Sequence, residues 1–187
     1  MKSVLISIQP KWCEKIASGK KTIEVRKTAP KEVPFKAYIY CTKDKPYLYR
    51  VDDDNNFELT NTLRPKTYEY VKDYNEQNGK IIGEFVCRGI MQPFYSLRLI
   101  AKESCLTEEE LLTYSKGKPL YGLRIADLKI YDKPKELSEF FKPCPTKEKG
   151  DCLSCDCLAD NDYGGVCTNN LTRPPQSYMF VEEIETR

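Results

Sequence analysis

Hydrophobic and polar residues in the first 26 positions follow two different periods, which predict a strand, a short helix and a second strand. Val4 to Ile8 is a mostly β-branched run, as is typical of a strand, and it ends before Gln9. Apolar residues then recur at helical spacing from Pro10 to Ser18, and proline is favourable at the first position of a helix. Gly19 predicts the end of this helix, because glycine readily adopts the left-handed conformation that terminates many helices.

The segment from Gly19 to Arg26, GKKTIEVR, ends in a strict alternation of polar and apolar residues. Successive side chains of a strand point to opposite faces, so Ile23 and Val25 are expected to share one face. The other face is expected to carry Thr22, Glu24 and Arg26, with Lys20 and Lys21 at the entrance to the strand. This polar row has two interpretations. It is either a surface that hydrogen-bonds a polar ligand such as a nucleobase, or the solvated face of a half-buried strand.

Further strands are predicted where β-branched and aromatic residues gather, at Ala37 to Cys41, Lys80 to Cys87 and Tyr121 to Tyr131. The last of these is expected to break near Ala126-Asp127, and a closing strand is expected from Tyr178 to Ile184. The pattern is weaker between residues 43 and 79. We expect a hairpin around residues 54–56 there, followed by an irregular or helical stretch across residues 68–78.

Two more helices are predicted in the second half of the chain. Thr107 and Glu110 have the spacing of a capping box, which indicates a helix that starts after Thr107 and ends near Gly117. A short helix is expected from Lys135 to Phe141, following a proline. Because strands dominate and helices are few and short, the expected fold is of the α+β class. We expect a small mixed β-barrel with short flanking helices.

The composition is that of an ordinary globular protein, with 40% hydrophobic and 31% charged residues. A chain of 187 residues is expected to form one domain over residues 1–187, with insertions near residues 43–79 and 144–173. The first long apolar run is too short for a signal peptide or a membrane span, so we expect a cytoplasmic protein that does not bind membranes. Residues 1–50 contain 12 Lys and Arg against 4 Asp and Glu, which is typical of a surface that meets phosphate.

The amino-terminal pattern resembles the ASCH domain, a member of the PUA-like superfamily. The resemblance rests on VLISIQPKWCEKIASGKKTIEVRK, in which Gly19, Lys21, Thr22, Glu24 and Arg26 match the motif G-x-K-T-x-E-x-R. It continues in GKIIGEFVC at residues 79–87 and in PPQSYMFVEE at residues 174–183. The resemblance implies a PUA-like barrel whose ligand is RNA, another single-stranded nucleic acid, or a modified nucleoside.

The side-chain types near this strand suggest which part of the ligand each residue would contact. Arginine suits bidentate contacts to phosphate or guanine, and readers of single-stranded RNA stack bases on aromatic rings. We therefore expect base contacts from Glu24 and Arg26, and phosphate contacts from lysines. The candidate ligand-binding residues are Lys11, Trp12, Lys20, Lys21, Thr22, Glu24, Arg26 and Tyr178.

A small hydrolase that acts on an acylated nucleoside is the alternative function. The superfamily includes acetylcytidine amidohydrolases, in which a lysine, a threonine and a distant glutamate carry catalysis. Lys21 matches that lysine, whereas Glu24 stands at the position of the threonine. A carboxylate cannot serve as a hydroxyl nucleophile, so a hydrolase of this kind would use Lys21 and Glu24 as a different working pair. A binding module is the favoured interpretation.

Five of the nine cysteines lie within 24 residues, which makes a structural zinc ion the candidate cofactor. Clustered thiols in a cytoplasmic chain favour metal over disulfides, and a chain without histidine can offer zinc only cysteine ligands. Cys152 and Cys155 have the spacing of a zinc knuckle. The candidate ligands are four of Cys144, Cys152, Cys155, Cys157 and Cys167, and the alternative is a surface insertion without metal. The other four cysteines are expected in or near the core.

Overall fold

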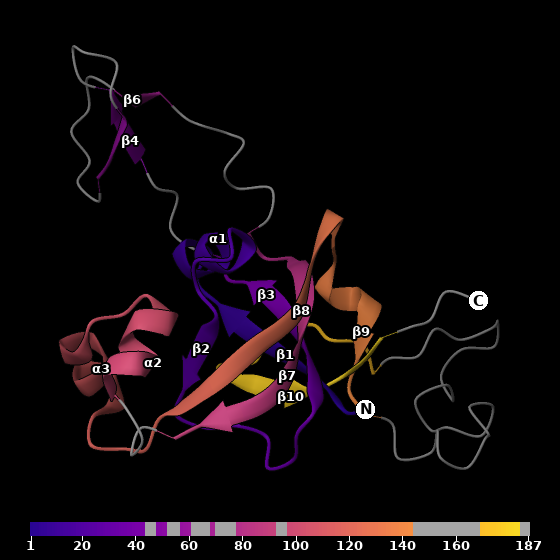
Figure 1. Ribbon diagram of the computed structural model, residues 1–187. Helices are drawn as coiled ribbons and strands as arrows, with labels where there is room; N and C mark the ends of the chain where they lie inside the picture. The colour runs from indigo at the N-terminus through magenta and orange to yellow at the C-terminus, as the bar shows by residue number, and fades with distance from the viewer. Residues whose placement is uncertain are drawn as a thin grey trace, which may run out of the picture.

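A computed structural model describes residues 1–43, 48–51, 57–60, 68–69, 78–92, 97–143 and 169–183 (Figure 1). The main body is a mixed six-stranded half-barrel with three short helices, and the fold is of the α+β, PUA-like class. Its strands run in the order β10-β1-β3-β7-β8-β2. They are β1 (Ser3–Ile8), β2 (Ile23–Arg26), β3 (Phe35–Cys41), β7 (Ile81–Met91), β8 (Tyr121–Lys135) and β10 (Tyr178–Phe180). No described helix is long and apolar enough to cross a membrane.

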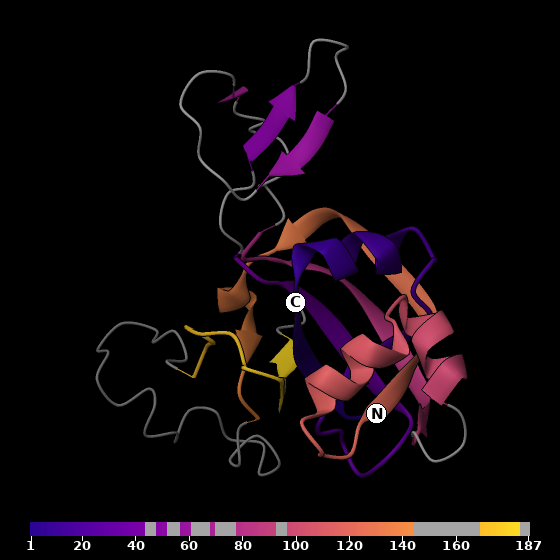
Figure 2. The same cartoon turned by 90° about the vertical axis from the view of Figure 1, so that its left-hand side faces the viewer.

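The remaining described elements are short. The helices are α1 (Pro10–Ala17), α2 (Leu97–Ser104) and α3 (Glu108–Ser115). A two-stranded sheet pairs β9 (Phe140–Phe141) with β11 (Glu182–Glu183), and a three-stranded sheet pairs β4 (Leu48–Val51) with both β5 (Phe57–Thr60) and β6 (Tyr68–Glu69). Figure 2 shows α2 and α3 next to each other at the side of the half-barrel.

The parallel pair of strands β1 and β3 organises the amino-terminal half of the fold. Residues Ser3–Ile8 pair in register with residues 36–41, and the chain between them forms α1 and β2. The helix α1 packs on the sheet through Cys13 and Ile16, which are both buried. Gly19 follows with a φ of 72°, as predicted from its place after the helix. All other neighbouring strands of the six-stranded sheet pair antiparallel.

Apolar residues fill both faces of the sheet. One cluster lies between α1 and the strands β1, β3, β7 and β8, and it includes Ile6, Ile39 and Phe85. A second cluster lies on the opposite face around Phe140, and a third joins β2 to α2 and α3. Cys13, Cys41 and Cys87 are buried and Cys105 is partly buried, as expected for core and near-core thiols.

The structure confirms most of the predicted elements and refines their ends. The strands at Val4 to Ile8, Ala37 to Cys41 and Lys80 to Cys87 are present, and the last continues as far as Met91. The predicted break at Ala126-Asp127 is an irregularity in the pairing of β7 with β8, where Asp127 adopts a φ of 48°. β4 and β5 pair antiparallel on either side of the expected hairpin turn, and the turn itself lies outside the described residues.

Two expectations about the chain need correction, and one helix was not predicted. The helix predicted from Lys135 to Phe141 is wrong: β8 extends to Lys135 because this residue pairs with Ile81, and only a short 3₁₀ turn precedes β9. Pro134 is tolerated there because the β7–β8 register is broken between Ile130 and Lys135. The helix α2 was not predicted. The stretch expected to be irregular or helical begins with strand β6, and its residues 70–77 lie outside the described part.

Candidate functional site

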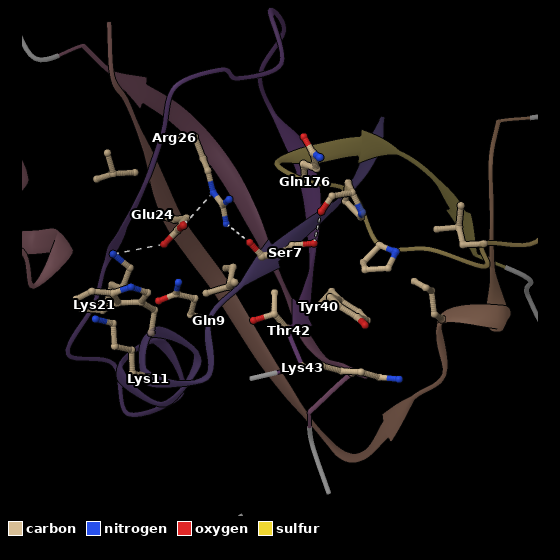
Figure 3. A pocket seen from close by; sticks show the side chains of 18 of the residues that line it. Ser7, Gln9, Lys11, Lys21, Glu24, Arg26, Tyr40, Thr42, Lys43 and Gln176 are labelled. Atoms are coloured by element: carbon tan, nitrogen blue, oxygen red, sulfur yellow. Dashed lines mark hydrogen bonds and ion pairs between the residues drawn. The ribbon is translucent and has the colours of Figure 1, made fainter. Parts of the chain in front are cut away.

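A cleft of about 1070 Å³ opens beside α1, where the ends of β1 and β3 meet β2 (Figure 3). Its walls come from segments far apart in the sequence, including the start of α1, one face of β2, part of α3 and residues 170–176. Such a junction of several elements can hold a ligand in contact with many side chains at once. The cleft is therefore the candidate functional site.

The polar face of β2 forms one side of this cleft and is buried. Lys21 is 2% exposed, Glu24 is 6% exposed and Arg26 is 8% exposed, and all three line the cleft. Ile23 and Val25 are buried against α2 and α3, and Val25 also lines the cleft. The interpretation as a solvated strand face is therefore wrong for Glu24 and Arg26, whereas Thr22 is exposed. The helices α2 and α3, which follow β7, cover the apolar face of β2, and the polar face lines the cleft.

Glu24 lies between two cations. Its Oε2 atom is 3.4 Å from Lys21 Nζ, and its Oε1 atom is 3.0 Å from Arg26 Nε. Lys21 Nζ also donates a hydrogen bond of 2.8 Å to the Ser104 carbonyl at the end of α2. Two positive side chains therefore hold one buried carboxylate, and the three charged groups together carry a formal charge of +1.

Arg26 links β2 to both ends of the chain. Its Nη2 atom donates a hydrogen bond to the Ser7 carbonyl in β1. The Ser7 hydroxyl in turn donates a hydrogen bond of 2.6 Å to the Pro175 carbonyl. Within the described residues, the buried Arg26 Nε makes no hydrogen bond, although it lies at ion-pair distance from Glu24. The guanidinium is thus held in place by the Ser7 carbonyl and the Glu24 carboxylate.

Burial lowers the pKa of the Lys21 amine from its ordinary value, because the charged form loses its water. The nearby Glu24 carboxylate opposes this effect by its charge and by a hydrogen bond, and Arg26 adds to it by repulsion. The amine therefore gives up its proton more readily than a surface lysine. Perturbed lysines of this kind occur both at functional sites and in structural ion pairs.

Trp12 is surrounded by ammonium groups. The Nζ atoms of Lys11, Lys15 and Lys21 lie 4.5 Å, 5.0 Å and 5.1 Å from the centre of its ring. Such cation–π contacts are attractive, so they restrict the orientation of the indole ring at the cleft. Trp12 and Lys11 both line the cleft, and Lys11 is exposed. This end of the cleft therefore combines an aromatic ring with positive charge.

The helix α3 supplies another part of the wall through Glu110 and Tyr114. The Glu110 carboxylate accepts a hydrogen bond of 2.7 Å from the Thr107 backbone, and Thr107 Oγ1 accepts one of 3.0 Å from the Glu110 backbone. This is the predicted capping box. The hydrogen bond from the Thr107 backbone lowers the pKa of Glu110. Lys27 Nζ lies 4.7 Å from the centre of the Tyr114 ring.

The structure brings five of the predicted ligand-binding residues together at the cleft: Lys11, Trp12, Lys21, Glu24 and Arg26. Three others do not line it. Lys20 and Thr22 are exposed, and Tyr178 packs against the core and against Phe180. The candidate zinc ligands Cys144, Cys152, Cys155, Cys157 and Cys167 lie outside the described residues. Among the residues that are described, no group of three or more His, Cys, Asp or Glu side chains could hold a metal ion.

Several residues that line the cleft were not predicted, and they come from segments that only the fold brings near β2. They are Ser7, Gln9, Tyr40, Thr42, Lys43, Glu110, Tyr114, Asn170 and Gln176 (Figure 3 labels six of them). Their common signal is position at the end of a strand or helix, where side chains of several elements converge. Such a signal becomes specific only once the order of strands is known.

Comparisons with known proteins agree on the type of fold. A family model described as "ASCH domain" matches residues 6–149. The chain is similar to the crystal structure of ASCH from Zymomonas mobilis, with 20% sequence identity and a TM-score of 0.54, over 97% of this chain and 88% of that one. A single-residue variant of the same Zymomonas protein matches with 19% identity and a TM-score of 0.52, over 97% and 91% of the two chains. No curated protein matches the chain.

Proposed function

Since this chain belongs to the ASCH domain family, we propose that its cleft binds an unpaired nucleotide, and that the protein is a binding module for single-stranded RNA or a modified nucleoside. Membership of the family supports the type of fold but does not identify the ligand. The proposal itself rests on the chemistry of the cleft, and above all on the buried group of Lys21, Glu24 and Arg26.

This group matches the edge of a nucleobase better than it matches a simple anion. Base edges present hydrogen-bond donors and acceptors side by side, and proteins read them with carboxylates and arginines. Glu24 offers a fixed acceptor, and the guanidinium of Arg26 next to it is a donor that also lines the cleft. A carboxylate at the centre of a site for phosphate alone would repel the ligand, because both groups are negatively charged. The pairing of acceptor with donor is the observation that carries the proposal.

The surroundings of the group fit the rest of a nucleotide. Trp12 supplies an aromatic ring at the cleft, and stacking on such rings is the usual means of holding unpaired bases. Lys11 lies beside it and can attract phosphate. A base inside a duplex cannot reach a cleft of this kind without leaving its stack, so a single strand is the better ligand.

The position of Trp12 provides a direct test, because it is the only tryptophan of the chain and it lines the cleft. Its fluorescence is titrated with nucleosides, nucleotides, single-stranded RNA and duplex RNA of the same sequence. We expect a saturable change with the single strand, weakened by salt because phosphate contacts release counterions. Trp12→Phe serves as the optical control, with binding followed by labelled RNA. The absence of saturable binding by every nucleotide and single strand would show that the proposal is wrong.

A second function is favoured by one observation, the lowered pKa of the buried Lys21 next to Glu24. In this alternative, water adds to the acyl carbon of an acylated nucleoside, and the bond to nitrogen breaks to release a carboxylic acid and the free amine. Lys21 and Glu24 would move the protons. The test is chromatographic detection of the acid after incubation with acyl-nucleosides. Release that depends on the wild-type protein and is lost in Lys21→Ala would establish a hydrolase, whereas binding without release would exclude this reaction.

A further inference from the structure

We infer that the cleft holds two consecutive nucleotides of one strand, with a second subsite at the end where Tyr40 and Lys43 lie. The inference rests on the proposed function and specifies its ligand: an oligonucleotide of at least two residues rather than a free nucleoside. The observations that carry it are the size of the cleft, the chemistry of its far end and the position of Lys43.

The cleft is larger than one nucleoside needs. Sites for single drug-sized ligands measure about 300 to 1,000 Å³, and a nucleoside belongs in the lower part of that range. The cleft measures about 1070 Å³. Lys21, Glu24, Arg26 and Trp12 lie at one end of it, and Figure 3 shows Tyr40 and Lys43 at the opposite end, with Gln9 and Thr42 between. A base held by Glu24 and Arg26 therefore leaves the Tyr40 end free.

The far end offers the same kinds of group as the first end. Tyr40 is an aromatic residue of β3 that is only 4% exposed and still lines the cleft, so its position is fixed by the core behind it. Pro174 and Pro175 also line the cleft and add apolar surface to its wall, with the Pro175 carbonyl bonded to Ser7. Along the rest of the cleft, hydroxyl and amide groups for hydrogen bonds to a sugar or a base edge come from Thr42, Ser138, Asn170, Thr172 and Gln176.

Lys43 supplies positive charge at this end. Its side chain lies across Gly79, where an added Cβ would come within 2.7 Å of Lys43 Cε. The absence of a side chain at Gly79 therefore leaves room for the lysine stem along the edge of the cleft. Among the described residues, Lys43 has no ion pair, whereas the nearby Glu136 carboxylate is 3.2 Å from Lys80 Nζ. Lys43 is thus available to a phosphate, as Lys11 is at the other end.

The test compares ligands that differ by one feature at a time. Trp12 fluorescence is titrated with 5′-monophosphates of the four bases, with the corresponding 3′,5′-bisphosphates, and with dinucleotides carrying a 5′-phosphate. The bisphosphate has the second phosphate without the second nucleoside, so it separates charge from occupancy. We expect the dinucleotide to bind at least about tenfold more tightly than the bisphosphate of its first nucleoside, as stacking and hydrogen bonding of a second base would give.

Variants at the far end should affect only the longer ligand. Lys43→Ala and Lys43→Glu should reduce the affinity for the dinucleotide and leave the affinity for the monophosphate unchanged within a factor of about two. Lys31→Ala is the matched control, because Lys31 is exposed and does not line the cleft. Tyr40→Leu provides a second test of the same end, with its folding checked by circular dichroism.

The outcomes separate this inference from the proposed function. Equal affinity for monophosphate and dinucleotide would overturn the second subsite and leave a one-nucleotide site. Equal affinity for bisphosphate and dinucleotide would show that the far end binds only phosphate, which also overturns it. Failure of all nucleotides to bind would contradict the proposed function, and this inference with it.

Discussion

Lys21 Nζ lies 3.4 Å from Glu24 Oε2, and the two side chains are 2% and 7% exposed. A buried ion pair repays the loss of hydration only when further hydrogen bonds satisfy its atoms. Here the Ser104 carbonyl accepts from Lys21, and Arg26 lies against the other carboxylate oxygen. The pair is therefore part of a network that fixes the β2 side of the cleft to the end of α2, and its disruption should be measurable as a change in stability.

The first prediction concerns this stability. Lys21→Met preserves the length of the side chain but removes the ammonium from Glu24 and from the Ser104 carbonyl. Loss of one partner from a buried pair costs about 3 to 5 kcal/mol, and we expect the lower part of this range because Arg26 remains beside Glu24. Urea denaturation of wild type and variant at neutral pH measures the difference. A variant as stable as wild type would show that the network contributes nothing net.

The same variant reports on pH dependence. Because burial lowers the pKa of folded Lys21, the unfolded chain binds more protons between the folded pKa and the unfolded value of about 10.4. The free energy of unfolding therefore gains from this group as pH rises through that range. Lys21→Met lacks the group, so the stability of wild type relative to the variant should increase from neutral pH to about pH 10. A difference that stays constant or shrinks would contradict the direction of the pKa shift.

The second prediction isolates the influence of Glu24 on Lys21. The carboxylate raises the pKa of the amine and so opposes the effect of burial. Glu24→Gln removes the negative charge between two cations, so the pKa of Lys21 should fall further. Isotope-labelled lysine followed by NMR through a pH titration measures this value, and Lys21→Arg identifies the resonance by its disappearance. An unchanged or raised pKa in Glu24→Gln would contradict the prediction.

The third prediction concerns Arg26 and ligand binding. Loss of a bidentate contact to a base or phosphate costs about 1 to 3 kcal/mol, so Arg26→Ala should weaken binding of a single-stranded oligonucleotide by that amount. Arg98→Ala is the matched control, because Arg98 is exposed on α2 away from the cleft. Because Arg26 is buried and donates to the Ser7 carbonyl, Arg26→Ala should also destabilise the protein. Arg26→Lys therefore accompanies it, and equal affinity of all three variants with wild type would exclude a role for Arg26 in binding.

The fourth prediction concerns the helix that carries Glu110 and Tyr114. Thr107→Ala removes the side chain that accepts a hydrogen bond from the Glu110 backbone. Loss of such a cap costs about 1 kcal/mol, and Thr107→Ser should recover most of it. Chemical denaturation of the two variants checks the order. A Thr107→Ser variant no more stable than Thr107→Ala would show that the hydroxyl is not what stabilises the start of α3.

The fifth prediction comes from the sequence alone. If Cys152 and Cys155 bind zinc with two of Cys144, Cys157 and Cys167, protein purified under reducing conditions without chelator should contain one metal ion per chain. Elemental analysis measures this directly. The double variant Cys152→Ser/Cys155→Ser should lose the metal, whereas Cys105→Ser should retain it. A wild-type protein that is folded and free of metal would contradict the zinc site and favour a surface insertion without metal.

Local sequence patterns predicted the elements whose signals are themselves local. The β-branched run before Gln9, the capping box at Thr107 and the glycine after α1 all act within a few residues, and the structure contains each of them. The prediction of a helix from Lys135 was wrong because the signal that determines this segment is not local. That segment pairs with Ile81, more than fifty positions earlier, and such a partner leaves no trace in local periodicity.

In the candidate site, too, local signals were predictable from the sequence and long-range contacts were not. Alternation along residues 22–26 placed Glu24 and Arg26 on one face, but it could not show whether water or protein covered that face. The answer depends on the curvature of the half-barrel, because β1 and β2 lie near opposite edges of the sheet and still come within hydrogen-bonding distance through Ser7 and Arg26. Tyr40 and Lys43 were missed because their own segment reads as an ordinary strand and its end. Only the parallel pairing of β1 with β3 carries them to the cleft.

The contact between Ser7 and Pro175 joins residues 168 positions apart, and it sets the moment during protein synthesis at which the cleft is completed. The side of the cleft with Lys21, Glu24 and Arg26 also needs later residues, because β2 pairs with residues 121–124 of β8 and Lys21 donates a hydrogen bond to the Ser104 carbonyl. The wall at residues 174–176 emerges only near the close of the stretch described above. Chains fold from the amino terminus as they emerge, so the cleft has all of its described walls only after residue 176 has been made.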